Sequence, residues 1–333
     1  MTVSNIPDYR VTLDGEDMTS KLRPRLVSLG ITTKRGDEAD QLDIVLDDTD
    51  GQLALPKPGA VLQVELGWLQ GSGVRPGLVS MGSFQVDEVE HGGPPDLVTI
   101  RGRSADFTSD LQKRREQSWH DTTLGAVVGE VASRNGLAAR CADDLADIAL
   151  DTVAQSRESD MALMRRLGRE HDAVATIKRG TLILAPVGSA KAAGGAALPR
   201  FTLDRSKGDR HSFRIEKREE AEGVTASWHD RDAAERKSVT VGKSTGARQL
   251  SHVYSSESHA KRAAKAKLAH AKRQPLSLTL ALALGRADLY PDKKGSVTGF
   301  KGDIDAVDWL IAEVTHSVSD RGFTTALKME SVP

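Results

Sequence analysis

The sequence contains little cysteine and few aromatic residues. Cys141 is the single cysteine in 333 residues, so no disulfide can form within the chain, and this composition suits synthesis in a reducing compartment. No histidine and no expected helix start lies near Cys141 in the sequence to activate it, so we interpret its thiol as structural. Aromatic residues make up 4% of the chain, which argues against an aromatic-lined ligand pocket or a base-stacking platform.

The sequence also lacks an excess of one charge and a long apolar run, and we expect no leader. Its formal net charge is -1, which disfavours nucleic acid as a partner. Residues 1–8 have neither the basic nor the apolar region of a signal peptide. The longest apolar runs are far shorter than a bilayer requires. We therefore expect a soluble protein, made and assembled inside a cell, with no membrane partner.

Residue sets typical of catalysis or metal binding are missing from the sequence. The nine histidines include no HExxH pair and form no cluster with cysteine, so we expect no metal site. Glu170-His171-Asp172 resembles part of a base–orienter pair, but consecutive side chains point in different directions. The stretch 239–245 contains Gly-Lys-Ser, yet Lys237 stands where a P-loop requires glycine. We expect no catalytic residue and no cofactor.

Both ends of the chain show the two-residue alternation of β-strands. Several such strands, joined by turns rich in glycine, proline and aspartate, predict a barrel or a sandwich at each end. One helix is expected among the C-terminal strands, at 256–273, with Ser256 as its cap. The expected strands are 9–13, 42–47, 61–68, 83–90 and 97–101, then 224–228, 276–282, 309–318 and 323–329.

The middle of the chain has helical periodicity instead. The apolar residues of 124–131 share one face of a helix, which Thr122 or Thr123 can cap and Asn135-Gly136 can end. A hairpin is expected at 173–185, with its turn after the first six residues.

A Q-x-x-E-S-D motif at 155–160 runs into a second helical pattern at 158–170. We expect Ser156 to cap this helix, and the charges of Glu158 and Asp160 to favour its positive N-terminal end. We therefore interpret the motif as structural and not catalytic. It comprises Gln155, Ser156, Glu158, Ser159 and Asp160.

These patterns predict an α+β fold that is mainly β. We expect β domains at 1–105 and 200–333, an α+β domain at 106–186, and a linker at 187–199, where glycine, alanine and proline show no periodicity. No tandem repeat of 20–50 residues is visible. The two β segments are nevertheless compatible with distant structural copies of each other.

The helix at 256–273 is rich in lysine and arginine. One interpretation is a partner interface that includes Lys261, Lys265 and Lys267. The alternative is a solvated face on a helix that packs through Ala263, Ala264, Leu268 and Ala271. The near-zero net charge favours the solvated face and, if there is a partner, a protein over DNA.

Short motifs in a fixed order along the chain carry a family resemblance. The N-terminal group is 46–56 followed by Pro58-Gly59, and the middle group contains Trp119 and the Q-x-x-E-S-D motif. The C-terminal group comprises Tyr254, Gly299-Phe300, Trp309, Ile311, Val314-Thr315-His316, Gly322 and Thr324. In this order they resemble the phage late control D proteins. These are baseplate hubs of contractile phages and R-type pyocins, related to the hub part of type VI secretion spikes.

The resemblance implies a structural hub made in the bacterial cytoplasm and incorporated into the baseplate of a phage tail or pyocin. It implies a homotrimer that joins the hexameric tail tube to the trimeric central spike, with other baseplate or tape-measure proteins as further partners. Two tube-like β-barrel domains per chain would form a pseudo-sixfold ring. Because the chain ends at Pro333, soon after its last strand, we expect the spike to be a separate polypeptide.

Two other functions stay open at this point. A tail-associated peptidoglycan hydrolase would need paired acids or a Cys/His pair in a cleft. A DNA-binding assembly protein would use the basic helix 256–273, with binding that weakens as salt increases. The choice between a phage and a pyocin stays open as well.

Overall fold

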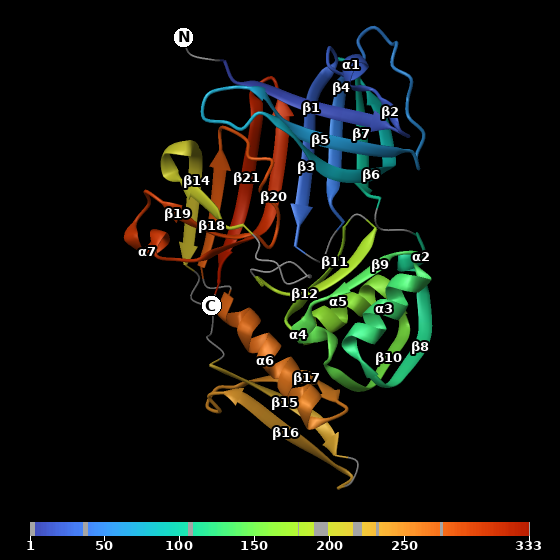
Figure 1. Cartoon of the computed structure of the whole chain (residues 1–333), viewed down its shortest axis with the longest axis vertical. Coiled ribbons are helices and arrows are strands. Elements are labelled where there is room, and N and C mark those ends of the chain that lie inside the picture. The colour runs from blue at the N-terminus through green and yellow to red at the C-terminus, as the bar shows by residue number, and fades with distance from the viewer. Residues whose placement is uncertain are drawn as a thin grey trace.

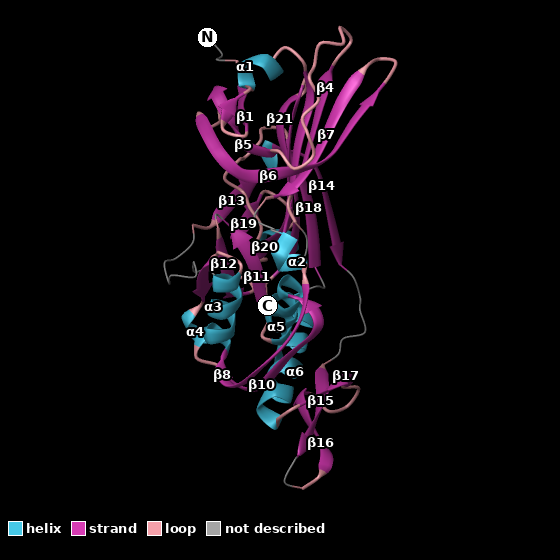
Figure 2. Cartoon of the chain, turned by 90° about the vertical axis from the view of Figure 1, so that its right-hand side faces the viewer, coloured by secondary structure: helices cyan, strands magenta, loops and turns pink. Residues whose placement is uncertain are grey.

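The chain folds into one large β-sheet with two smaller units at the same end of it (Figure 1). Figure 2 shows the elongated outline, with α1 and β16 at opposite ends. Strands predominate over helices, which confirms the predicted mainly β character. No helix in the described part of the chain is long and apolar enough to cross a membrane. The computed structural model describes residues 4–35, 39–105, 109–178, 180–189, 199–215, 222–230, 233–273 and 276–332.

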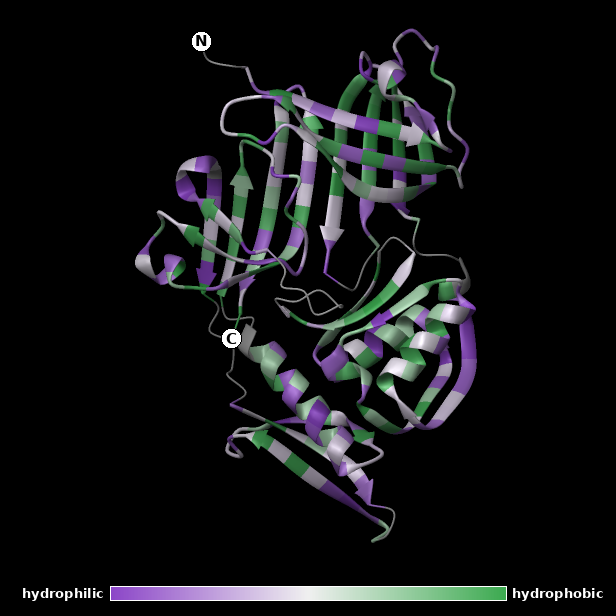
Figure 3. Ribbon diagram, viewed as in Figure 1, coloured by the Kyte–Doolittle hydropathy of each residue, from purple (hydrophilic) through white to green (hydrophobic). Residues whose placement is uncertain are grey.

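The N-terminal β unit is a sheet folded around its own core. β6 pairs with β5 through its first half and with β7 through its second half, so the sheet turns at this strand. Along β4 the inward-pointing Leu42, Ile44 and Leu46 are at most 2% exposed, and Figure 3 shows this alternation on the strands of the sheet. The elements are β1 Ile6–Leu13, β2 Glu16–Asp17, α1 Thr19–Leu22, β3 Leu26–Lys34, β4 Gln41–Asp47, β5 Val61–Gln70, β6 Gly77–Gly92 and β7 Leu97–Ser104.

The C-terminal β unit has a separate core centred on Trp309. The indole of Trp309 is fully buried and donates a hydrogen bond to the carbonyl of Ile304 at 3.1 Å. The ring of Phe213 meets it edge-on, with 6.2 Å between centroids. The elements are β13 Phe201–Asp204, the 3-10 turn η1 Arg205–Lys207, β14 Gly208–Ile215, β18 Leu276–Leu282, β19 Lys294–Thr298, α7 Gly302–Asp305, β20 Trp309–Ser319 and β21 Gly322–Ser331.

The two β units are structural copies of each other. The N-terminal unit pairs its strands in the order β3-β4-β7-β6-β5-β1, and the C-terminal unit in the order β14-β18-β21-β20-β19-β13, which is the same sequence of connections. The one difference in direction is the last pair, which is antiparallel for β1 and parallel for β13. Even the bulges agree: single extra residues stand at Val27 and Asp209, and at Asp87 and Ala312.

Aligned on the bulges of β6 and β20, the copies share a short sequence pattern. Phe84-x-Val86-x-Glu88-Val89-x-His91 corresponds to Trp309-x-Ile311-x-Glu313-Val314-x-His316. The cross-strand ion pairs also correspond, since Glu88 contacts Arg101 at 3.0 Å and Glu313 contacts Lys328 at 2.8 Å. A left-handed residue precedes β5 and β19 at equivalent places, Gly59 and Asp292.

An antiparallel pairing of β3 with β20 joins the two copies into one 13-stranded sheet. We call this pairing the seam; it runs from Ser28 opposite Ser319 to Lys34 opposite Glu313. On its outer face the hydroxyls of Thr32 and Thr315 are 3.1 Å apart. The copies are therefore joined directly by a backbone ladder of hydrogen bonds.

The central unit lies between the copies in sequence and has its own core. The predicted helix caps are seen on α3, where Thr123 accepts from the amide of Ala126 at 3.2 Å and Gly136 is left-handed. The predicted hairpin is seen as β11 and β12. The elements are α2 Ser109–Gln112, β8 Arg114–Thr123, α3 Leu124–Arg134, β9 Ala138–Cys141, α4 Asp143–Ala146, β10 Ala149–Ser159, α5 Asp160–Glu170, β11 Ala173–Lys178 and β12 Thr181–Pro186.

A third unit, the α6 unit, is inserted between β14 and β18 of the C-terminal copy. It consists of β15 Gly223–Asp230, β16 Glu235–Gly242, β17 Arg248–Tyr254 and α6 Glu257–Arg273, with a core that is separate from the large sheet. Residues 200–333 are thus divided between two sheets, whereas one barrel was expected. The reason is a long insertion at a strand connection that in the N-terminal copy spans only 35–40. Residues 190–198 of the expected linker lie outside the described residues.

Candidate functional site: the polar network around Asp160

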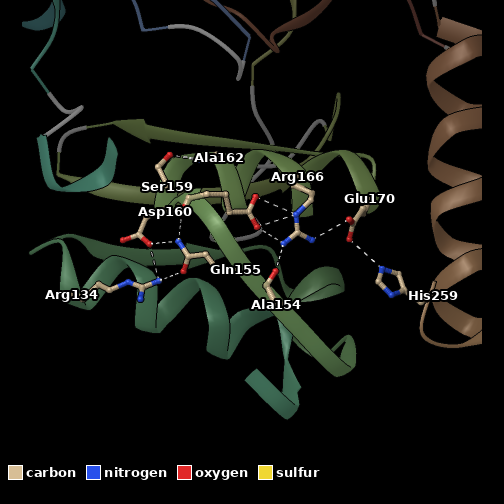
Figure 4. A network of polar contacts seen from close by, with 10 residues as sticks. Arg134, Ala154, Gln155, Ser159, Asp160, Ala162, Arg166, Glu170 and His259 are labelled. Carbon is tan, nitrogen blue, oxygen red and sulfur yellow. Dashed lines mark hydrogen bonds and ion pairs between the residues drawn. The ribbon is translucent and has the colours of Figure 1, made fainter. Parts of the chain in front are cut away.

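Asp160 is a carboxylate that is completely buried in the central unit. Its oxygens contact the Gln155 amide at 2.8 Å and Arg134 Nη2 at 2.9 Å (Figure 4). They also contact the Asn135 amide at 2.8 Å and Arg115 Nε at 3.3 Å. These donors come from β8, from β10 and from the C-terminal end of α3 with its cap Asn135, so one side chain of α5 connects three other elements. A buried carboxylate is tolerated when its lone pairs are satisfied in this way.

Arg166 forms the second half of the network. Its guanidinium contacts Glu158 at 2.6 Å and Glu170 at 3.3 Å, and it donates to the carbonyl of Ala154 at 2.8 Å. Burial alone would lower the pKa of Arg166, but the hydrogen bond to Glu158 and the two acidic charges outweigh it and raise the pKa. Arg166 therefore stays charged and fixes α5 against β10.

The network continues from the central unit into the α6 unit. His259 Nε2 lies 3.2 Å from Glu170 Oε2, and Arg262 Nη2 donates to the carbonyl of Ala149 at 3.4 Å. Burial would raise the pKa of Glu170, but its contacts with His259 and Arg166 lower it overall. Burial, with the positive charge of Arg262, lowers the pKa of His171 to about 4. These contacts dock the α6 unit on the central unit.

The structure corrects the predicted helix start. Ser156 is not the cap: it lies in β10, which extends to Ser159 by pairing with β8 past a bulge at Arg157. The cap is Ser159, whose hydroxyl accepts from the amide of Ala162 at 3.2 Å, and the helix begins at Asp160 instead of residue 158. Strand pairing with β8 fixes Ser156 in an extended backbone, which the local sequence did not indicate.

The structure brings the Q-x-x-E-S-D residues together but adds partners that the sequence did not reveal. Gln155, Glu158 and Asp160 all belong to the network, whereas Arg134 and His259 reach it from other elements. No local motif marks those two residues, because their role depends on tertiary packing. Within the described residues, no group of three or more histidine, cysteine or acidic side chains is arranged to hold a metal ion.

The thiol of Cys141 fits the structural interpretation. Burial, reinforced by the charges of Asp144 and Asp143, raises the pKa of Cys141 to about 11. The thiol therefore stays protonated near neutral pH and is a poor nucleophile.

The basic helix α6 is buried on one side and exposed on the other. Ser256 accepts from the amide of His259 at 3.4 Å, as predicted for a cap. Of the four residues expected to pack, Ala263, Ala264 and Leu268 are buried and Ala271 is exposed. The residues of the possible partner interface lie on the other side: Lys261 and Lys265 are exposed and Lys267 is half-buried.

Comparison with known proteins gives consistent results over nearly the whole chain. The sequence model of the family Phage tail baseplate hub (GPD) matches residues 40–322. The probable baseplate hub protein of Escherichia phage 186 is 42% identical over 365 residues, which cover 97% of this chain and 92% of that protein.

Two solved structures have a similar fold at low sequence identity. The tail protein from Neisseria meningitidis MC58 has a TM-score of 0.72 at 15% identity, with 97% of this chain and 96% of that chain covered. A component of the type VI secretion system of E. coli has a TM-score of 0.53 at 13% identity, with 93% and 74% covered.

Proposed function

The chain belongs to the phage tail baseplate hub family, and from this premise we propose that three copies form a ring joining the hexameric tail tube to the trimeric central spike. In this role the chain is a structural protein without catalysis of its own, and it assembles with the tube, the spike and other baseplate or tape-measure proteins. The observation that carries the proposal is the duplicated β unit: one chain supplies two β units with the same order of strand pairing.

The duplication supports a match between two symmetries. Three chains contribute six equivalent β units, which can meet a sixfold tube, while the threefold relation between chains can meet a trimeric spike. The α6 unit interrupts only the C-terminal copy, so the two copies differ at that connection. Figure 1 shows the central unit and the α6 unit at the same end of the large sheet. We infer that the opposite end faces the tube and that this end faces the spike.

The polar network supports a structural role for the chain and not a catalytic one. The carboxylates of Glu158, Asp160 and Glu170 are each engaged by positively charged or amide groups inside the protein. A hydrolase needs a carboxylate that is free to exchange a proton with its substrate. Here Glu158 and Asp160 connect elements within the central unit, and Glu170 connects that unit to the α6 unit.

The first experiment counts copies in assembled particles. Quantitative mass spectrometry of purified tails, scaled to the tube protein, should give three copies of this chain per particle. Particles are required because a ring held by contacts between separately folded units can dissociate when neither spike nor tube is present. Six copies per particle, or a location in the sheath or fibres, would contradict the proposal.

We further propose that the exposed lysines of α6 face another baseplate protein. Replacing Lys261 and Lys265 by glutamate should reduce particle assembly while leaving the thermal midpoint of the purified chain unchanged, because both side chains are exposed. Glutamine at the same positions is the matched control and should have a smaller effect. Normal particle yield from the glutamate variant would show that this face is only solvated.

A further inference from the structure

The seam inside the chain shows how one β unit binds the next. In it, the second half of β20 pairs with β3, and on the other edge β20 pairs with β21. At its first residues β20 also pairs with β19, on the same edge as β3. One strand therefore serves two neighbours on one edge, first a strand of its own unit and then a strand of the other copy.

The equivalent strands at the other ends of the two units have open edges. β6, the counterpart of β20, pairs with β5 only as far as Gln85, so residues 87–92 have no partner on that edge among the described strands. Among the described strands, β14, the counterpart of β3, pairs with β18 alone, so its other edge is open as well. An exposed edge of this kind is a template for another strand.

Side chains that the seam buries have exposed counterparts on these open edges. His316 is 1% exposed, whereas the side chain of its counterpart His91 is 43% exposed. Ile31 is fully buried, whereas its counterpart Phe213 is only partly buried. Two residues further along β14, Ile215 is 66% exposed, which is unusually high for an isoleucine. The open edge of β14 therefore carries exposed apolar surface, and the open edge of β6 carries the exposed counterpart of a histidine that is buried at the seam.

The bulges fix the register between the two open edges. Alignment of Asp87 with Ala312 makes Glu90 the counterpart of Thr315, and alignment of Val27 with Asp209 makes Arg214 the counterpart of Thr32. Thr315 and Thr32 are directly opposite each other in the seam. The same pairing between copies would therefore place an acidic residue opposite a basic one, a favourable cross-strand pair.

We propose that residues 89–92 of β6 in one copy pair antiparallel with residues 212–215 of β14 in the next copy. Glu90 then lies opposite Arg214, and His91 lies opposite Phe213. This inference rests on the proposed ring of copies and specifies its interface. The large sheet continues from chain to chain, and seams within chains alternate with equivalent seams between chains.

Disulfide trapping in assembled particles tests this register. In a Cys141→Ser background, Glu90→Cys with Arg214→Cys should give covalent multimers under mild oxidation, ending at three chains. Residues directly opposite each other on antiparallel strands have Cα separations of about 4.5–5.5 Å, within the range that a disulfide needs. Thr32→Cys with Thr315→Cys is the matched control, which should close within one chain and give no multimer. Glu90→Cys with Ser212→Cys is the register control and should link far less.

The outcomes separate this inference from the proposed ring. Three copies per particle without multimers from Glu90→Cys and Arg214→Cys, while the internal control closes, would overturn the inferred interface and leave the ring intact. Equal linking by the register control would overturn the register. A copy number other than three would instead contradict the proposed function.

A charge exchange provides a second measurement if the cysteine variants fail to assemble. Glu90→Arg alone and Arg214→Glu alone place like charges opposite each other, and each should reduce particle yield roughly tenfold. The double variant restores opposite charges and should recover most of the yield. No recovery would contradict the pairing of these two residues.

Discussion

The two β units share one pattern of strand pairing but have different neighbours. In the C-terminal unit, β20 is covered by β3 and His316 is buried; in the N-terminal unit, the equivalent part of β6 is open and His91 is exposed. For the strands on the other edge the units exchange roles: β3 of the N-terminal unit is covered by β20, whereas its counterpart β14 of the C-terminal unit ends the sheet. The comparison teaches that the backbone ladder fixes each unit, whereas the neighbouring unit determines which edge is buried.

The largest expected effect distinguishes the covered strand from the open one. Ile31→Asp would bury an unpaired carboxylate in the seam and should destabilise the chain by more than about 4 kcal/mol. Ile215→Asp lies on the counterpart strand, where the side chain is exposed, and should change stability by less than about 0.5 kcal/mol. Urea denaturation of the purified variants measures both values. Equal losses would mean that β14 is covered within the single chain.

The buried histidine of the C-terminal copy, His316, should lower the stability of the chain in acid. Burial lowers the pKa of His316 to about 4. Since the unfolded histidine binds its proton near pH 6.5, the unfolded state holds more protons between these values, and stability falls as the pH falls from about 6.5 to about 4. The loss by pH 4 should be on the order of 3 kcal/mol.

A variant of the buried histidine tests this prediction directly. His316→Gln should flatten the fall in stability over this range. His171 contributes a similar fall from the central unit, because burial and the charge of Arg262 lower its pKa to about 4. Denaturation midpoints from pH 7 to 4 provide the measurement. An unchanged slope in His316→Gln would contradict a buried neutral imidazole.

A smaller effect is expected in the central unit, which has no counterpart and so serves as a reference for the two copies. Ser159→Ala removes the cap of α5 and should cost about 1 kcal/mol. Ser156→Ala is the matched control in β10 and should change stability by less than about 0.5 kcal/mol. Thermal unfolding compares them. A larger loss from Ser156→Ala would restore Ser156 as the cap.

The smallest expected effect concerns the equivalent ion pairs of the two copies. Glu88 with Arg101 and Glu313 with Lys328 occupy matching surface positions, and exposed pairs contribute little. Double-mutant cycles on each pair should give small coupling energies that agree within error. A large coupling in one copy alone would show that the two surfaces are not equivalent.

The sequence predicted the fold best where one side of an element is buried. β4 alternates Leu42, Ile44 and Leu46 with polar residues, and α3 and α5 have clear apolar faces, so these elements were identified correctly. β8 and β10 were missed because they form a polar ribbon, and the local periodicity of such a ribbon is weak. β14 and β16 were missed because charged residues interrupt their apolar positions.

The duplication and the complete network depend on contacts that are distant in the sequence. The sequence pattern that β6 and β20 share is short. The central unit lies between the copies and the α6 unit interrupts one of them, so no regular repeat appears in the sequence. Arg134 and His259 join Asp160 and Glu170 only after α3 and α6 have packed. The motif residues were therefore predicted as a structural group, while most of their partners were not.

The most direct test of the hub assignment is a cryo-electron microscopy reconstruction of the baseplate in intact particles. We expect three copies of this chain in a ring between tube and spike, with six β units arranged around the axis. The central unit and the α6 unit should lie on the spike side. A reconstruction with six copies, or with this chain outside the junction of tube and spike, would contradict the account.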